Sequence, residues 1–215
     1  MKAYIIGVGP GDPGLLTVRG LERIKECDVV TGWKSVLERF SSLLEGKKVI
    51  ELSYREELAR LREAFSSGGK VCVLDHGDPS VSDFQFVEKV KKVASELGYE
   101  VEVIPGVSSV NAVMARLGLD LANVIYYTMH VRGDEGELFK GLEEILKCRR
   151  YRKLILFPPP DRKGVSRAAK FLLERLGDVE AVVLERVTFP DEKVVRAKLS
   201  DLLDYENSDL VVIVI

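Results

Sequence analysis

The first half of the chain alternates short runs of apolar residues with stretches in which apolar residues recur every three or four positions. The runs are rich in Val, Ile and Leu, as in strands buried on both faces, whereas the second pattern is typical of amphipathic helices. The predicted strands are residues 3–8, 28–31, 48–52, 71–74 and 100–104. The predicted helices are residues 15–26, 56–65, 86–97 and 108–117, with Thr17 as a candidate N-cap of the first. This alternation predicts an α/β domain with a mostly parallel, Rossmann-like sheet.

The second half shows a different order of elements. Its predicted strands are residues 125–128, 153–157, 180–184, 194–198 and 210–215, and its predicted helices are residues 135–146 and 166–175. The last two strands are not separated by a long helix, and parallel neighbours need such a crossover. We therefore expect a mixed sheet here. The predicted domains are residues 1–117 and 118–215.

Composition narrows the class of protein. Of the 215 residues, 46% are hydrophobic and 31% are charged, which suffices for a buried core and excludes disorder as the main state. Lys+Arg 32 against Asp+Glu 34 gives a net charge of -2, so the basic excess of a nucleic-acid binder is missing. The longest apolar run, residues 210–215, is far shorter than the roughly 20 residues that cross a bilayer. With no signal peptide recognised at the N-terminus, we expect a cytoplasmic protein without a membrane or nucleic-acid partner.

The cysteines are Cys27, Cys72 and Cys148, an odd number at wide spacing. This pattern predicts reduced thiols in or near the core, and neither a disulfide framework nor a zinc site. With two histidines in the chain and no cysteine near His76, we expect no metal at His76 and Asp78.

Three loops that follow predicted strands carry the residues suited to chemistry. The first, Gly9 to Gly14, satisfies the GxGxxG pattern of dinucleotide sites. However, Pro10 and Pro13 lack the amide hydrogens that a pyrophosphate needs, and Asp12 adds a negative charge. The details therefore argue against a nicotinamide site, and a tight Gly/Pro turn is the alternative.

The second loop has the sequence DHGDP from Asp75, and the third has PGVSS, which contains Ser108 and Ser109. Gly77 allows a ligand to approach the backbone, and Asp75 or Asp78 can accept from an ammonium or a ribose hydroxyl. The serines suit an N-cap whose neighbouring amides hold a carboxylate. Taken singly, an Asx turn and a capped helix account for both loops. Together, three strand ends at one sheet edge predict a small-molecule site.

The segments GVGPGDPGLLTVRG, HGDPSVSD and VIPGVSSVNAVMARLGL, in this order, resemble the tetrapyrrole methylase family. Within the family the chain is most similar to the branch that methylates C5 of a corrin precursor in cobalamin biosynthesis. The resemblance implies two α/β domains, S-adenosylmethionine in a cleft between them with S-adenosylhomocysteine as product, a tetrapyrrole substrate and a homodimer. It also implies that a separate protein performs C15 methylation and decarboxylation, because the chain ends at Ile215.

The resemblance also implies site residues. Those expected to contact the cofactor are Pro10, His76, Gly77, Asp78, Val81, Ser108, Ser109, Phe157, Pro158 and Ala197. Those expected to face the substrate are Gly11, Asp12 and Arg132. The candidates for taking a proton after methylation are Asp12, His130 and Glu185, and the sequence does not choose among them.

The chain departs from the family pattern at three places. Asp83 stands where the family has a glycine, His130-Val131-Arg132 replaces a His-Gly-Arg element, and residues 158–160 are consecutive prolines. Alternative functions are methylation of uroporphyrinogen III, of another corrin position or of ribosomal RNA, the last disfavoured by the net charge. An alternative from another class is a nucleotide-binding module without catalysis.

Overall fold

A computed structural model describes residues 1–81, 83–149 and 152–215. Internal contacts divide it into two compact units, Met1–Ser109 and Val110–Ile215, and each is described by itself. The sequence-predicted division differs in assigning residues 110–117 to the first domain, and it stays a prediction about domains that fold independently.

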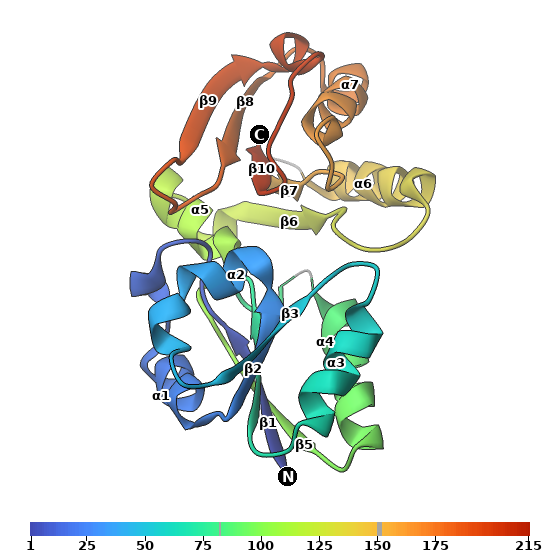
Figure 1. Ribbon diagram of the computed structural model, residues 1–215. Helices are drawn as coiled ribbons and strands as arrows, with labels where there is room; N and C mark the ends of the chain where they lie inside the picture. Colours follow the sequence, from blue (N-terminus) through green and yellow to red (C-terminus); the bar gives the residue numbers. More distant parts are fainter. Residues whose placement is uncertain (82, 150–151) are drawn as a thin grey trace. The chain divides into compact units, whose positions relative to one another are not determined.

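The first unit is built on a sheet of five parallel strands in the order β3-β2-β4-β1-β5 (Figure 1). The strands are β1 (Lys2–Gly7), β2 (Val29–Trp33), β3 (Lys48–Leu52), β4 (Val71–Asp75) and β5 (Glu100–Ile104). The helices are α1 (Val18–Glu26), α2 (Lys34–Arg39), α3 (Glu57–Ser66) and α4 (Phe84–Glu96), with short 3-10 helices η1 (Pro13–Leu15) and η2 (Ser41–Leu43). The predicted parallel sheet is confirmed.

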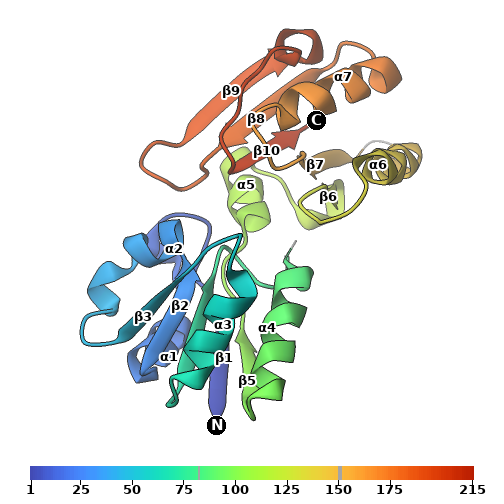
Figure 2. The ribbon, with the colours of Figure 1, turned by 45° about the vertical axis from the view of Figure 1, so that its right-hand side comes forward.

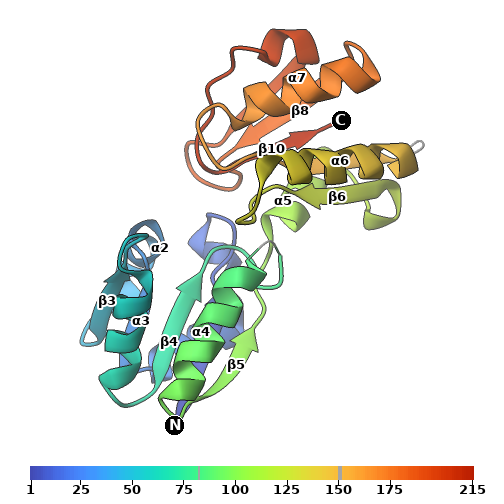
Figure 3. The ribbon, with the colours of Figure 1, turned by 90° about the vertical axis from the view of Figure 1, so that its right-hand side faces the viewer.

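Successive strand residues point to opposite faces of this sheet, so each face has its own core. Ile5 packs with Leu61 of α3 and Val90 of α4, whereas Ile6 packs with Ile24 of α1 and Val36 of α2. Figure 1 shows α1 and α2 on one side of the sheet and α3 and α4 on the other, and Figure 3 shows the side with α3 and α4 toward the viewer. This double cover is why the strands read as continuous apolar runs.

Two details of the helices differ from the prediction. The first helix begins at Val18 instead of residue 15, because Pro13–Leu15 forms the separate 3-10 turn η1. Its predicted cap is confirmed, since the hydroxyl of Thr17 accepts a hydrogen bond from the Gly20 amide at 3.1 Å. Helix α2 was not predicted: six residues are too few to show a helical period.

The second unit contains a mixed sheet, as predicted, and its strand order is β6-β7-β10-β8-β9 (Figure 2). Its strands are β6 (Val124–Thr128), β7 (Lys153–Phe157), β8 (Glu180–Glu185), β9 (Lys193–Lys198) and β10 (Val211–Val214). Its helices are α5 (Ser109–Leu117), whose first residue belongs to the first unit, α6 (Glu135–Arg149) and α7 (Gly164–Leu176), with the 3-10 helices η3 (Leu121–Asn123) and η4 (Leu199–Leu202). Strands β6 and β7 pair in parallel, whereas β7 with β10, β10 with β8, and β8 with β9 pair antiparallel. Leu142 of α6 and Leu172 of α7 share one core with Leu156 of β7. In the residues described, no helix has the length and apolar character needed to cross a bilayer.

The expectation of three reduced core thiols is wrong for this structure. Cys27, which follows α1, and Cys72 of β4 are both buried and form a disulfide between positions 45 residues apart. Cys148 is a free thiol but is exposed on α6. The number and spacing of cysteines did not reveal this pair, because packing of α1 on the sheet brings the two Cα atoms to 5.9 Å.

Replacing both Cys27 and Cys72 by alanine is expected to lower the free energy of unfolding by about 4 kcal/mol, since the bond closes a long loop in the unfolded chain. Denaturant unfolding of the first unit, followed by Trp33 fluorescence, measures this. Cys148→Ala is the matched control and should leave the midpoint unchanged. Three reactive thiols in the denatured, unreduced protein would show that the bond does not form.

Candidate functional site

The first and second loops of the first unit are joined by backbone hydrogen bonds at the carboxyl edge of the sheet. Gly9 and Gly77 form an isolated β-bridge in which each amide donates to the other's carbonyl, at 3.2 and 3.0 Å. The Val8 amide donates to the Asp75 carbonyl at 3.0 Å. Two of the three loops expected to converge are therefore held in one backbone arrangement.

The third loop meets them through glycines. A Cβ atom at Gly106 would lie closer than 3.0 Å to the Gly77 carbonyl oxygen and to backbone atoms of Gly7. A Cβ at Gly7 would meet the same carbonyl at 2.6 Å. Gly77 itself has a φ of 58°. The three loops thus approach each other at backbone distance, and only glycine permits this.

Asp78 links the second and third loops. Its Oδ1 accepts a hydrogen bond from the Ser80 amide at 2.7 Å, as in an Asx turn, and its Oδ2 accepts one from the Gly106 amide at 3.3 Å. The Val81 amide donates to the Asp78 carbonyl at 2.9 Å. The sequence-predicted cofactor contact at Asp78 therefore also holds the loops together.

Arg39, on the unpredicted helix α2, connects the first and second loops from the side. Its Nη1 donates to the Gly11 carbonyl at 3.2 Å, and its Nη2 lies 3.2 Å from Nδ1 of His76. Its Nε donates to the Ser35 carbonyl at 3.1 Å. Recognising α2 would have been needed to find Arg39 from the sequence.

The contact with Arg39 fixes the proton on His76. Burial, and then the positive charge of Arg39, lower the pKa of His76 to about 4, so the ring is neutral at neutral pH. A guanidinium only donates hydrogen bonds, so Nδ1 must accept and the ring proton must sit on Nε2. His76 therefore presents an N–H donor at Nε2.

Asp75, at the end of β4, is fully buried. Burial raises the pKa of its carboxyl group well above the ordinary value, and the negative charge of Asp83 raises it further. Asp83, at the position where the resemblance implies a glycine, precedes α4 with a φ of -124°. Any residue adopts this backbone, so this turn forms without a glycine there.

The remaining predicted residues of the first unit lie on the same edge. Pro10 and Gly11 are buried, whereas Asp12 is exposed and its Oδ1 accepts from the Gly14 amide at 2.7 Å, which caps η1. Ser108 is buried and Ser109 begins α5. The structure thus brings the first-unit residues of the expected site together; their contacts with a ligand stay predictions.

In the second unit, Phe157 and Pro158 lie at the carboxyl end of β7 and are buried. His130 packs edge-on against Phe157, with ring centroids 5.4 Å apart. Arg132 follows on the surface. These residues share one end of the sheet, and the consecutive prolines begin there.

His130 carries its proton on the opposite nitrogen from His76. Its side chain donates to the Pro158 carbonyl, and its Nε2 is buried without a hydrogen-bond partner among the described residues. The donor is therefore Nδ1. Burial lowers the pKa of His130 to about 4, although the bond to Pro158 favours the charged ring.

Two other predicted residues lie apart from this end. Ala197 is on the edge strand β9 and pairs with Ala181 of β8, so β10 and β8 separate it from β7. Glu185 ends β8, where its carboxylate accepts from Tyr205 Oη at 2.6 Å and from the Ser208 amide at 2.5 Å. Burial raises the pKa of Glu185, but these bonds outweigh it and the net pKa is lowered. The roles predicted for both residues stay predictions.

The two histidines are expected to be opposite neutral tautomers: a proton on Nε2 in His76 and on Nδ1 in His130. Nitrogen NMR with labelled histidine reads both, since the chain has two. In Arg39→Ala, His76 should become a mixture of tautomers with a pKa raised part of the way toward 6.5, because the neighbouring charge is gone. Arg39→Lys, which keeps the charge and a donor, should preserve the tautomer. An unchanged His76 signal in Arg39→Ala would refute the assignment, and His130 is the internal control.

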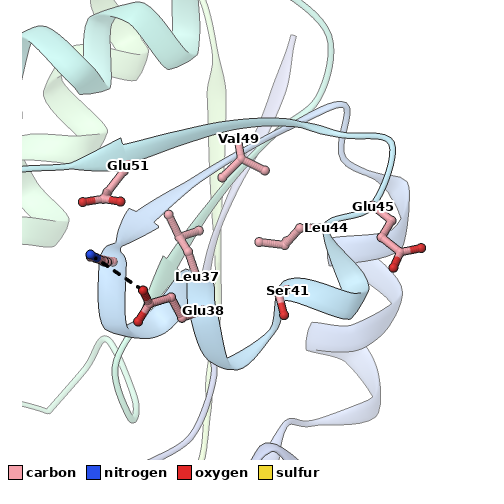
Figure 4. A pocket seen from close by; sticks show the side chains of 8 residues that line it. Leu37, Glu38, Ser41, Leu44, Glu45, Val49 and Glu51 are labelled. Atoms are coloured by element: carbon pink, nitrogen blue, oxygen red, sulfur yellow. Dashed lines mark ion pairs between the residues drawn. The ribbon is translucent and has the colours of Figure 1, made fainter.

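A separate surface hollow of about 510 Å³ lies between α2 and β3 (Figure 4). Its lining residues are Lys34, Leu37, Glu38, Ser41, Leu44, Glu45, Val49 and Glu51. Figure 4 shows apolar side chains at its centre and glutamates around them. With one lysine against three glutamates, this hollow repels anionic ligands.

Comparison with known proteins shows the family of this chain. The family model for tetrapyrrole (corrin/porphyrin) methylases matches residues 2–203. The precorrin-4 C(11)-methyltransferase of Pseudomonas aeruginosa is 30% identical over 94% of this chain and 83% of its own length. The probable cobalt-precorrin-7 C(5)-methyltransferase of Methanocaldococcus jannaschii is 29% identical over 98% of this chain and 96% of its own length.

Another relative is a much longer protein, and only part of it matches this chain. The cobalamin biosynthesis protein CbiHC of Archaeoglobus fulgidus is 34% identical over 54% of this chain, and the match spans 27% of that protein. Among solved structures, the methyltransferase CobJ has a TM-score of 0.80 at 21% identity, covering 99% of this chain and 92% of that one, and it supports the fold alone. From the family match over most of its length, the chain belongs to the tetrapyrrole (corrin/porphyrin) methylases, a family of S-adenosylmethionine-dependent methyltransferases.

Proposed function

We propose that this chain methylates C5 of a corrin precursor of the cobalt-precorrin-7 or precorrin-6Y type in cobalamin biosynthesis. The observation that carries the position is the end-to-end similarity to the probable cobalt-precorrin-7 C(5)-methyltransferase, which covers 98% of this chain and 96% of that protein. The match to the relative named for C11 covers 83% of that protein. The motif VIPGVSSVNAVMARLGL supports the same branch.

The residues of the first unit fit S-adenosylmethionine. A Cβ added at Gly77 would fill space bounded by the Ser108 Cα at 3.7 Å, the Ser109 amide at 3.8 Å and the Val107 carbonyl at 3.9 Å. Because glycine leaves that space open, backbone donors and acceptors surround a small cradle, and His76 adds the N–H at Nε2. Ribose hydroxyls and an amino-acid group need partners of this kind. We infer that Gly77, Ser108 and His76 hold the cofactor.

Bound S-adenosylmethionine would supply an electrophilic methyl group on a sulfonium. The chain's main contribution is then to hold two reactants in line and to exclude water, and orientation of this kind is worth about 7–11 kcal/mol. The bridge between Gly9 and Gly77, the Asp78 link and the Arg39 contacts make the loops a rigid holder. Positioning of this kind needs rigid loops, and these loops are held by many backbone hydrogen bonds.

The proton acceptor is a further part of the proposal. Methylation of a ring carbon would give the macrocycle a positive charge, which it would lose by releasing a proton to a base. Glu185 is already occupied by Tyr205 and Ser208. Nε2 of His130 is buried. The carboxylate of Asp12 is exposed, is held by its bond to the Gly14 amide, and lies in the loop that the family resemblance sets toward the substrate, so we propose Asp12 as the proton acceptor.

Two measurements test the function. Calorimetry should show S-adenosylhomocysteine binding at about one per chain and no binding of NAD. Incubation with methyl-labelled S-adenosylmethionine and isolated corrin intermediates should give a single labelled methyl carbon at C5. A label at another corrin carbon or on uroporphyrinogen III would show that the chain has the acceptor of another member of the family. Binding of NAD alone would indicate a nucleotide-binding module.

The proposal also covers the oligomeric state of the protein, its location and the fate of its product. We expect a cytoplasmic homodimer, and sedimentation velocity measures the oligomeric state. We also expect the product to pass to a separate protein that methylates C15 and removes a carboxyl group. Conversion of the isolated product by such a protein would support this order.

A further inference from the structure

A fully buried carboxyl group without a hydrogen-bond donor lies at the start of the second loop. Asp75 ends β4 and is 0% exposed, and neither of its carboxyl oxygens has a hydrogen-bond partner among the described residues. An ionised carboxylate in this position would be strongly destabilising, because nothing replaces the water that it has lost. Another buried acid, Glu57 of α3, is neutralised by Lys89 of α4 at 2.5 Å. In the ranges that the structure describes, no cation does the same for Asp75.

The side chain that meets Asp75 belongs to a second acid. Side chains alternate along a strand, so Asp75 points to the same side of the sheet as Val73, which packs with α3 and α4. Asp83 precedes α4, and Phe86 of that helix belongs to the same core (Figure 3). The carboxyl group of Asp83 lies within hydrogen-bonding reach of that of Asp75. The contact therefore joins the end of β4 to the start of α4.

This contact requires a proton. Two ionised carboxylates can only accept hydrogen bonds, so one of the two acids must be protonated. Burial raises the pKa of Asp75, and the charge and the contact of Asp83 raise it further; Asp78 acts in the same direction, whereas the nearby His76 amide opposes part of the rise. Asp75 is therefore the acid that keeps its proton at pH values at which an ordinary aspartate is ionised, and its O–H donates to Asp83.

The contact joins the two ends of the second loop. His76, Gly77 and Asp78, which we assign to the cofactor or to the link between loops, lie between the two acids in the sequence. A bond between the ends reduces the conformations open to the loop, so less entropy is lost when a ligand binds. The glycine that the resemblance implies at position 83 could not make this contact. Asp83 therefore gives this chain a means of holding the loop.

We propose that Asp75 and Asp83 share one proton and that their contact holds the second loop in the geometry that binds S-adenosylmethionine. Both are positioning residues, because they act through the loop. Loss of the proton to solvent would leave two negative charges in contact, which would separate the ends of the loop and weaken cofactor binding. The inference rests on the proposed function in one respect, the assignment of the second loop to the cofactor.

Infrared spectroscopy of the ligand-free protein detects the shared proton directly. At about pH 6, where an ordinary aspartate is ionised, the unmodified protein should show the carbonyl stretch of a protonated carboxyl group, and Asp75→Asn should lack it. Asp83→Asn removes the negative charge beside Asp75, so this band should disappear at a lower pH than in the unmodified protein. Asp204→Asn is the matched control, since Asp204 is an exposed acid of the second unit, and it should leave the band unchanged. A spectrum that Asp75→Asn does not alter overturns the proposal.

The affinity for S-adenosylhomocysteine, measured from about pH 5 to pH 9, tests the positioning role. Both histidines titrate below this range, at a pKa of about 4. The ratio of the affinity of the unmodified protein to that of Asp75→Asn cancels the titration of the ligand itself. This ratio should stay within about twofold of one while the infrared band is present, and should fall by up to about tenfold per pH unit once the band is lost. Asp83→Ala lacks the contact and should bind at least about tenfold more weakly at every pH.

The possible outcomes separate this inference from the proposed function. If the unmodified protein does not bind S-adenosylhomocysteine, the proposed function is wrong, and the role of the acid pair is wrong with it. If it binds, but Asp83→Ala binds as tightly, the acid pair alone is wrong. A ratio that falls while the infrared band persists would also overturn the role of the shared proton. Asp83→Asn and the infrared spectra provide the test if Asp83→Ala does not fold.

Discussion

Replacing Gly106 by alanine is expected to abolish S-adenosylhomocysteine binding and to lower the free energy of unfolding by more than about 4 kcal/mol. The new methyl group would lie closer than 3.0 Å to the Gly77 carbonyl and to the Gly7 backbone. Neither neighbour is the end of a flexible side chain, so the loops themselves must move apart. That movement also breaks the hydrogen bond from the Gly106 amide to Asp78. Calorimetric titration and denaturant unfolding measure the two effects.

Two further variants keep this prediction open to refutation if Gly106→Ala fails to fold. Gly77→Ala meets atoms no closer than 3.7 Å, but its φ of 58° strains an alanine by roughly 1–2 kcal/mol. It should fold and bind S-adenosylhomocysteine weakly, because its methyl group occupies the proposed cradle. Gly133→Ala has no atom within 4 Å and should change stability by less than about 0.5 kcal/mol. Full affinity in Gly77→Ala would show that the cradle does not hold the cofactor.

The strands and the edge that carries the site were predictable because their causes are local or topological. A parallel strand covered on both faces must be apolar throughout, as Val71 to Leu74 are, and this alone marks its position. Once strands and helices alternate, the loops at strand ends fall on one edge. The convergence of Gly9, Gly77 and Gly106 follows from that rule, although their backbone contact required the structure.

Features that depend on tertiary packing were not predictable. Helix α2 is too short to show a period, so Arg39, which fixes the tautomer of His76, had no signal in the sequence. The disulfide of Cys27 and Cys72 depends on how α1 lies on β4. The partners of polar groups are also set by packing: nothing in the sequence indicated that Asp78 accepts from Gly106, or that Glu185 is occupied by Tyr205 and Ser208.

Asp12→Asn is expected to lower the turnover number by about 10²–10⁴-fold, the usual contribution of a general base. Asparagine caps a helix as well as aspartate does, so the bond from the Gly14 amide and the shape of η1 should be kept. The change therefore removes the charge and basicity of the side chain with little effect on the loop. Single-turnover methylation of the corrin substrate, with binding of S-adenosylhomocysteine measured alongside, separates loss of chemistry from loss of the site.

The matched variants decide among the three candidates. Glu185→Gln removes a carboxylate to which Tyr205 and Ser208 already donate hydrogen bonds. It should therefore lower the free energy of unfolding but leave the turnover number nearly unchanged. His130→Gln should leave the rate near that of the unmodified protein if Asp12 takes the proton. If His130 were the base instead, its pKa of about 4 would give the unmodified enzyme an acid limb with a midpoint near that value, because the ring accepts a proton only while neutral. If His130→Gln lost activity while Asp12→Asn kept full activity, and the unmodified enzyme showed this acid limb, His130 would be the proton acceptor.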